Sequence, residues 1–273
     1  MPSTLFVADY GADAIFRYDA LTGAFVDVFA AGSAQRVDRP ASVRLGPAGQ
    51  VYAAGFGQGD IVRYDAQTGA MADVFYRDTT LLEEPVELAF HGDELVVVGN
   101  DTGNAVVIDP SGTAMRELGW PLMRGAHDFV LDDDILYVGL DAHESLGTTI
   151  QAWDLESGVL LRDFGPRAEL ETATGLAIID GVLYACDFHR SLVRAYDAAT
   201  GDSLGVLVGE HLDAPVSLER GPDGSLLVLD RRGIHRFELA TGAFLGTLIA
   251  AGDGHLDWPR SFTIIADAAL VAP

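Results

Sequence analysis

The sequence lacks lysine altogether and is poor in basic residues. Its 273 residues carry 17 Lys+Arg against 41 Asp+Glu, which gives a formal net charge of −24, and all 17 bases are arginine. A basic surface for nucleic acid or anionic lipid is therefore excluded, because neutralising phosphate groups needs clustered Lys and Arg. We expect neither nucleic acid nor a membrane among the partners of this protein.

Disulfides and long apolar runs are also missing. Cys186 is the only cysteine, so no disulfide forms within the chain. No window approaches about 18 uninterrupted apolar residues, which predicts that no helix crosses a membrane. The first residues, MPSTLFVADYG, lack a basic and a long apolar segment. We therefore expect no signal peptide and a cytoplasmic location, with a trimmed mature form as the alternative. The 49% of apolar residues is enough for a core and excludes a disordered chain.

A short motif, as in RYDALTGAF and RYDAQTGAM, recurs six times along the chain. The acidic residues of its copies are Asp19, Asp65, Asp109, Asp154, Asp197 and Glu238. Their intervals of 46, 44, 45, 43 and 41 residues fit one four-stranded blade of a β-propeller, which takes about 40–50 residues. Because Asp bonds nearby amides and Gly supplies a positive φ, we interpret the motif as a structural turn.

Three further β-rich segments accompany each turn, and helical periodicity is absent. We predict an all-β protein: one six-bladed β-propeller domain over residues 1–273, with four antiparallel strands per blade, and we expect a monomer. The first blade lacks an inner strand, and a spare one lies at Arg260–Ile265. The C-terminal strand is therefore predicted to join the N-terminal blade and close the ring. The tail at 267–273 looks like the start of another strand and has no place in this scheme.

The strand order predicts where a binding site lies. Loops between second and third strands share one rim with the crossings between blades, and the copies differ in sequence there. Divergence on a repeated scaffold is typical of binding specificity, so we expect a small molecule or peptide at this rim of the central channel. The candidate ligand-binding residues are Asp9, Tyr10, Glu87, Asp101, Asp141, Asp187 and Arg231.

Inner-strand ions are predicted to border the channel. They are Arg44, Glu87, Asp128, Glu219 and Arg260. Ions in a narrow channel must pair, meet water or meet a ligand. Arg44 and Glu219 are candidates for an ion pair across the channel. A positive patch of Arg231, Arg232 and Arg260 suits a carboxylate.

Three histidines fall on the same predicted rim: His127, His143 and His189. Three imidazoles with an open position suit a divalent metal, Zn²⁺ or Ca²⁺ being the candidates. The alternative is that these loop histidines are solvated or hydrogen-bond locally. With a metal bound, the site predicts a lyase or hydrolase with Asp128 or Glu144 as general base. Arg260 or Arg231 then holds a substrate carboxylate.

Two segments, IDGVLYACDFHRSLVRAYDAATG and GPDGSLLVLDRRGIHRFELATG, resemble the repeats of NHL-type propellers. Gluconolactonase-like and virginiamycin B lyase-like proteins are related six-bladed rings. The resemblance covers nearly the whole chain and implies the architecture. The metal-binding Asn of the first group corresponds to Thr174 here, and the Trp-Phe-Thr-Glu strand of the second is absent. Ala126–Phe129 is similar to the zinc-binding Pro-His-x-Leu strands of peptidyl-hydroxyglycine lyases at one strand only. Two functions stay open: a ligand- or protein-binding scaffold, and a metal-dependent enzyme.

Overall fold

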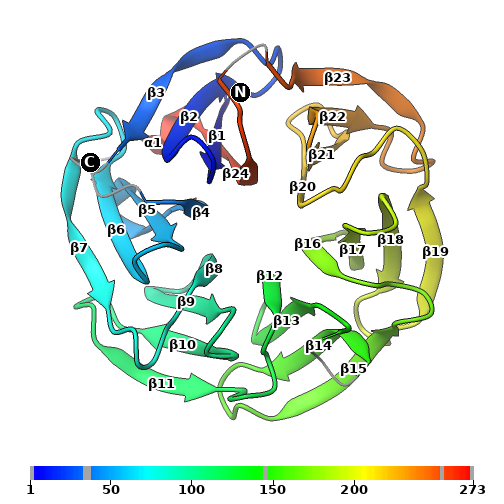
Figure 1. The fold of residues 1–273 in the computed structure, drawn as a ribbon, viewed down its shortest axis with the longest axis horizontal. Coiled ribbons are helices and arrows are strands. Elements are labelled where there is room, and N and C mark those ends of the chain that lie inside the picture. The colour runs from blue at the N-terminus through cyan, green and yellow to red at the C-terminus, as the bar shows by residue number, and fades with distance from the viewer. Residues whose placement is uncertain (1–2, 33–37, 144–146, 253–254, 271–273) are drawn as a thin grey trace.

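The computed structural model describes residues 3–32, 38–143, 147–252 and 255–270. Within these ranges, 24 strands form six sheets of four antiparallel strands, which stand like blades around a central axis (Figure 1). The predicted all-β, six-bladed propeller is confirmed. No helix in the described ranges is long and apolar enough to cross a bilayer.

Each blade runs from an inner strand beside the axis to an outer strand at the circumference (Figure 1). The inner strands are β24 (Pro259–Ala266), β4 (Pro40–Leu45), β8 (Pro85–His91), β12 (Ala126–Asp132), β16 (Ala173–Ile179) and β20 (Ser217–Arg220). The second strands are β1 (Ser3–Asp9), β5 (Gln50–Gly55), β9 (Glu94–Gly99), β13 (Ile135–Leu140), β17 (Val182–Asp187) and β21 (Leu226–Asp230). The third strands are β2 (Ala14–Asp19), β6 (Asp60–Asp65), β10 (Asn104–Ile108), β14 (Thr148–Asp154), β18 (Leu192–Asp197) and β22 (Gly233–Phe237). The outer strands are β3 (Phe25–Ala31), β7 (Met71–Arg77), β11 (Ala114–Leu118), β15 (Leu160–Pro166), β19 (Ser203–Val208) and β23 (Phe244–Ala250). A 3-10 turn, η2 (Pro47–Gly49), precedes β5.

The core lies between neighbouring blades. The second strands are apolar almost throughout, as in ELVVVG of β9, because both of their faces are covered. The outer strands alternate half-buried and exposed positions over most of their length because only one face meets a neighbour. Immediately before each acidic residue of the repeated motif stands a large buried side chain that fills the space between blades. These side chains are Tyr18, Tyr64, Ile108, Trp153, Tyr196 and Phe237.

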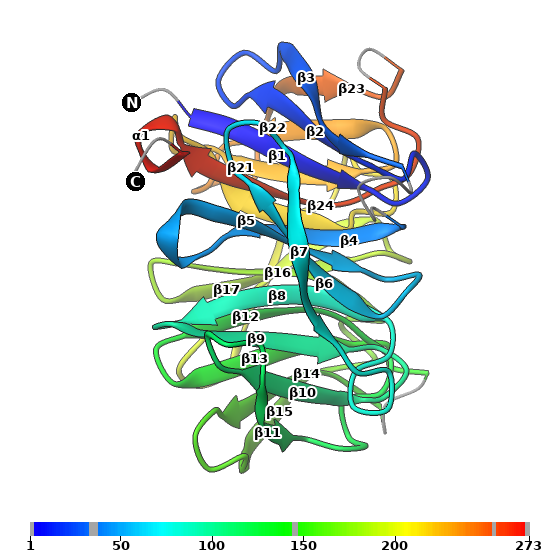
Figure 2. The ribbon, with the colours of Figure 1, turned by 90° about the vertical axis from the view of Figure 1, so that its left-hand side faces the viewer.

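The ring closes as the sequence predicts. Strand β24 pairs antiparallel with β1, Ser3 opposite Ala266, so the first blade has the order β24-β1-β2-β3. Figure 2 shows the two strands together, with the start of β1 and the end of β24 on the same side of the ring. The tail differs from expectation. Residues Asp267–Leu270 form a one-turn helix, α1, whose Asp267 accepts a 2.9 Å hydrogen bond from the Thr4 hydroxyl.

The repeated turn has the structural role that the sequence indicates. Asp65 Oδ1 accepts hydrogen bonds from the Thr68 amide and hydroxyl, both at 2.8 Å, and Gly69 follows with φ 68°. The first copy has the same bonds at Asp19. A Cβ on Gly69 would lie 1.8 Å from the carbonyl oxygen of Phe29 in the preceding blade. The turn therefore packs against its neighbour as well as reversing the chain.

Candidate functional site

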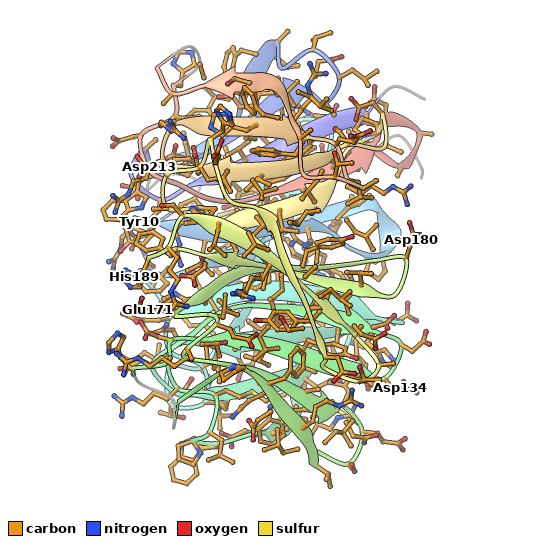
Figure 3. All side chains as sticks on the ribbon, turned by 90° about the vertical axis from the view of Figure 1, so that its right-hand side faces the viewer. Tyr10, Asp134, Glu171, Asp180, His189 and Asp213 are labelled. Atoms are coloured by element: carbon orange, nitrogen blue, oxygen red, sulfur yellow. The ribbon has the colours of Figure 1, made fainter. Side chains whose placement is uncertain are left out.

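The two ends of the ring carry different loops. Figure 3 places Tyr10, Glu171, His189 and Asp213 at one end, and Asp134 and Asp180 at the other. The first end, here called the upper rim, holds the loops between second and third strands and the crossings between blades. The opposite end, the lower rim, holds the hairpins between first and second strands. This is the arrangement expected from the strand order.

A pocket of about 290 Å³ opens on the upper rim and is called the Arg260 pocket. Its lining residues are Tyr10, Phe56, Asn100, His127, Trp258 and Arg260. Three of them form an aromatic wall: the Tyr10 ring lies 5.6 Å from Phe56 and 6.0 Å from Trp258, measured between centroids. The Arg39 guanidinium covers the outside of this wall and donates a 2.8 Å hydrogen bond to the Tyr10 hydroxyl. The wall is thus held in place before any ligand arrives.

Two nitrogen-bearing side chains at the base of this pocket have free hydrogen-bonding capacity. The Arg260 guanidinium has neither an ion pair nor a hydrogen bond among the described residues. Burial lowers its pKa, but guanidinium stays protonated in proteins. The Nδ1 atom of His127 is buried without a partner in the described structure. Burial and the charge of Arg260 lower the pKa of His127 to about 4, so its imidazole is neutral at pH 7. The pocket therefore carries one positive charge.

A second upper-rim pocket, of about 370 Å³, is called the Arg231 pocket. It is lined by Phe188, Val216, Arg231, Asp257, Trp258 and Pro259. The guanidinium carbon of Arg231 lies 5.1 Å from the Phe188 ring centroid, and its side chain has no ion pair among the described residues. Trp258, which is 53% exposed, forms a wall of both pockets. The two pockets are therefore adjacent.

The channel narrows below the Arg260 pocket to a neck of about 10 Å³ that Glu87 and Asp128 help to line. Asp128 accepts the amides of Phe129 at 2.7 Å and Leu176 at 2.6 Å. Glu87 accepts the Leu88 amide at 2.8 Å and lies 3.2 Å from Arg44. Burial raises the pKa of both carboxyls, and the nearby charge of Glu87 raises that of Asp128 further.

The expected pairing of Arg44 with Glu219 is wrong, because Arg44 reaches Glu87 on the adjacent inner strand instead. Glu219 accepts the Ile264 amide at 3.1 Å, and burial raises its pKa to about 7. Arg44, Asp128 and Glu219 border a cavity of about 420 Å³ that opens toward the lower rim. Arg44 is thus paired within the protein, whereas Glu219 is held by a backbone amide and forms no ion pair among the described residues.

Two predicted ligand-binding carboxylates, Asp9 and Asp187, are fully buried. Asp9 accepts the amides of Ala12, Asp257 and Trp258 at 2.8–3.0 Å. Asp187 accepts the amide of Glu171 at 2.9 Å. We expected both carboxylates to face a ligand, whereas in the structure their oxygens accept hydrogen bonds from loop amides. They are positioning residues, and Asp9 holds the backbone of Trp258.

The other predicted residues are spread along the rim. Tyr10 and Arg231 line the two pockets, while Asp101 pairs with Arg124 at 3.0 Å and lines neither. Asp141 Oδ1 accepts the His143 amide at 2.7 Å. Glu87 lies in the neck, inside the channel.

The three candidate metal ligands have different surroundings. His143 is exposed, and its ring nitrogens lie 3.3 Å from Glu171 and 3.0 Å from Arg167. His189 meets the Phe188 ring edge-on, and His127 is in the Arg260 pocket. Across the described ranges, no three His, Cys, Asp or Glu side chains group so as to hold a metal ion. Glu144, the alternative general base, lies outside the described residues. Metal binding stays a prediction.

Of the aromatic lining residues, Tyr10 is among the predicted ligand-binding residues, whereas Phe56, Phe188 and Trp258 are not, although the first two begin loops of the predicted rim. Loop aromatics follow no periodicity, so pattern analysis does not select them. The signal that could have found Trp258 is its place directly before Pro259, which opens the last inner strand. An apolar side chain at that point is close to the channel mouth.

Comparison with known proteins supports the fold. No protein-family model and no curated protein matches the chain. A chain in the crystal structure of the nidogen/laminin complex is 17% identical with a TM-score of 0.79, covering 97% of this chain and 98% of that chain. The WD40 β-propeller domain of Doa1 is 15% identical with a TM-score of 0.66, covering 89% and 77%. The computationally designed Ika8 protein is 20% identical with a TM-score of 0.59, covering 92% and 72%. Likeness at these identities shows the propeller fold alone, and the NHL-type grouping stays a prediction.

Proposed function

We propose that this protein binds an anionic ligand, a small carboxylate or the carboxylate of a peptide, in the Arg260 pocket. A propeller scaffold fits a binding role in general terms. The observation that supports this particular role is the unpaired Arg260 guanidinium at the base of a pocket with aromatic walls. Acidic residues outnumber bases in this protein by more than two to one, yet none pairs with Arg260 in the described structure.

The chemistry of the pocket suits a carboxylate. A guanidinium offers a planar fork of donors that matches two carboxylate oxygens, and such charge-assisted bonds are stronger than neutral ones. The aromatic wall lowers the local dielectric constant, which strengthens the attraction between opposite charges. His127, neutral at pH 7, adds a hydrogen bond at Nδ1 without adding charge. A desolvated cation with no internal partner is costly, and a bound anion would remove that cost.

Calorimetric titration with hippurate and with its uncharged amide tests the proposal. We expect hippurate to bind and the amide to bind at least about tenfold more weakly. Only hippurate has a carboxylate, which can accept two charge-assisted hydrogen bonds from the Arg260 guanidinium. Arg260→Gln should abolish this difference. Arg77→Gln removes the same charge from the end of β7, outside both pockets, and should leave it unchanged.

The proposal fails if hippurate and its amide bind the wild-type protein equally, or if Arg260→Gln keeps the preference. Thermal melts of both variants establish that the loss reflects the pocket and not unfolding.

A further inference from the structure

We infer that the ligand of the upper rim carries two anionic groups, one held by Arg260 and one by Arg231, joined by an apolar spacer that lies against Trp258. This inference rests on the proposed function and specifies its ligand class. It follows from the charge pairing of the arginines, from the shared wall between the pockets and from the polarity of the pocket linings.

Most arginines of this molecule are paired, and the five described exceptions are Arg77, Arg162, Arg167, Arg231 and Arg260, of which Arg231 and Arg260 line the two upper-rim pockets. Among the described arginines, eleven form an ion pair with a carboxylate of the chain. Arg231 and Arg260 do not, although their pockets adjoin on one rim. Arg232, the neighbour of Arg231 in sequence, pairs with Asp230 at 3.5 Å. Arg231 and Arg260 thus lie in adjacent pockets without an ion-pair partner among the described residues, although the chain contains 41 acidic residues.

Trp258 lies where the spacer of such a ligand would pass. Its side chain borders both pockets, and its backbone amide donates a 3.0 Å hydrogen bond to the buried carboxylate of Asp9. Tyr10 packs against the indole from one side. Phe188 and Val216 line the far pocket. An apolar chain crossing Trp258 would therefore touch apolar surface along its length, while its two ends meet guanidinium groups.

One acidic side chain, Asp257, also lines the Arg231 pocket. Its side chain is exposed and forms no ion pair among the described residues. It would repel the second anionic group without preventing contact. Asp257→Asn removes that repulsion while keeping the shape of the side chain, so this variant should bind a dianion more tightly than the wild type does.

The test compares linear dicarboxylates, from succinate to suberate, with monocarboxylates of the same chain length by calorimetric titration. One length should bind at least about tenfold more tightly than its monocarboxylate, because the second carboxylate meets Arg231. Arg231→Gln should reduce that dicarboxylate to the affinity of the monocarboxylate and leave the monocarboxylate unaffected. Asp257→Asn should raise the affinity for the dicarboxylate. Arg232→Gln removes a charge next to Arg231 but outside the pocket lining, and serves as the matched control.

The outcomes separate this inference from the proposed function. Equal binding of mono- and dicarboxylates at every length, with no effect of Arg231→Gln, overturns the two-anion ligand while leaving the Arg260 site intact. Absence of binding by all of these carboxylates, in the wild type and in Arg260→Gln alike, overturns both. Binding of dicarboxylates that Arg231→Gln weakens and Arg232→Gln does not weaken supports the inference.

Discussion

At the scale of single residues, two arginines of the channel differ in their partners. Arg44 forms an ion pair with a carboxylate of the protein, and Arg260 forms none among the described residues. Glu87 is buried beside Arg44 and receives further hydrogen bonds from Ser42 and Leu88. Arg260 lines both the neck and the pocket above it; the charge of Asp128 acts on it, but no carboxylate of the described residues forms an ion pair with it. A buried ion without compensation destabilises a fold unless another molecule supplies the partner. The contrast between these two arginines is the physical basis of the proposed site.

Glu219 makes stability depend on pH in a defined direction. Its pKa is about 7 in the folded protein against 4.5 for an unperturbed side chain, because burial disfavours the carboxylate. The folded state therefore binds more protons between these values, and the free energy of unfolding falls as pH rises from about 4.5 to 7. Glu219→Gln, which mimics the protonated form, should be more stable than the wild type at pH 8 by on the order of 2 kcal/mol.

Chemical denaturation at pH 4.5 and pH 8 measures this effect. The two proteins should have nearly equal stability at the lower pH. Glu156→Gln, at an exposed turn position, is the matched control and should change stability at neither pH. A Glu219→Gln variant no more stable than the wild type at pH 8 would contradict the expected cost of burying this carboxylate.

The candidate site was only partly predictable because residue type does not reveal what a side chain contacts. Tyr10 and Arg231 directly follow second strands, and His127 and Arg260 stand at the starts of inner strands. These strand ends meet at one rim, so topology alone brought the four residues to the pockets. Asp9 follows the same rule, yet its carboxylate turns inward to loop amides. Whether an Asp at a strand end faces a ligand or a backbone amide depends on the path of a loop nearly 250 residues away in sequence.

At the scale of the structural element, the repeated turn combines two requirements in one glycine. The positive φ of Gly69 is evident from the turn motif, because its sequence is local. The close approach of Gly69 to the Phe29 carbonyl joins two blades, and no local pattern encodes it. Gly23 and Gly242 make the same close approach to a neighbouring blade. A Cβ atom on Gly23 would lie 2.0 Å from the carbonyl oxygen of Leu248, and one on Gly242 would lie 1.9 Å from that of Leu207, both in outer strands. The motif therefore fixes the spacing of blades as well as the reversal of the chain.

Replacing Gly69 by alanine should show the cost of the positive φ and the cost of the close contact between blades. Comparison with Gly181→Ala, which has only the first cost, separates the two. Gly181 has φ 80° but nothing within 4 Å of a built Cβ, so Gly181→Ala should cost about 1 kcal/mol for the left-handed backbone alone. Gly69→Ala should cost about 2–4 kcal/mol, because the turn must also move away from Phe29. Urea denaturation of the two variants measures the difference. Equal losses would show that the contact between blades contributes nothing.

At the scale of the whole molecule, the −24 charge and the ring fold act together. Apolar side chains fill the spaces between blades, so most acidic side chains are left for the turns, outer strands and rims. Like charges spread over such a shell repel one another and oppose compaction. The same shell is the reason for expecting no polyanion among the partners, while the short-range attraction of two unpaired guanidinium groups remains available within their pockets.

Salt should therefore stabilise this protein. We expect the thermal midpoint at pH 8 to rise between about 20 mM and 500 mM sodium chloride, because screening weakens repulsion between exposed carboxylates. Near pH 4.3, where the sequence has no net charge, the same salt should have little effect. Calorimetric scans at the two pH values measure both quantities. A midpoint at pH 8 that does not respond to salt would show that repulsion across the shell is negligible.

The pairing of β24 with β1 also determines the order in which the blades can be completed during synthesis. Strand β1 ends at Asp9, and its partner begins at Pro259. At about 5–20 residues per second, the ribosome needs on the order of 10–50 s to deliver the intervening chain. During that time the backbone edge of β1 that later pairs with β24 has no partner strand, and the apolar side chains of β1 are not yet covered by the complete blade. The blade that emerges first is thus the last to be finished, and the nascent chain must keep that edge from other partners until translation reaches the final strand.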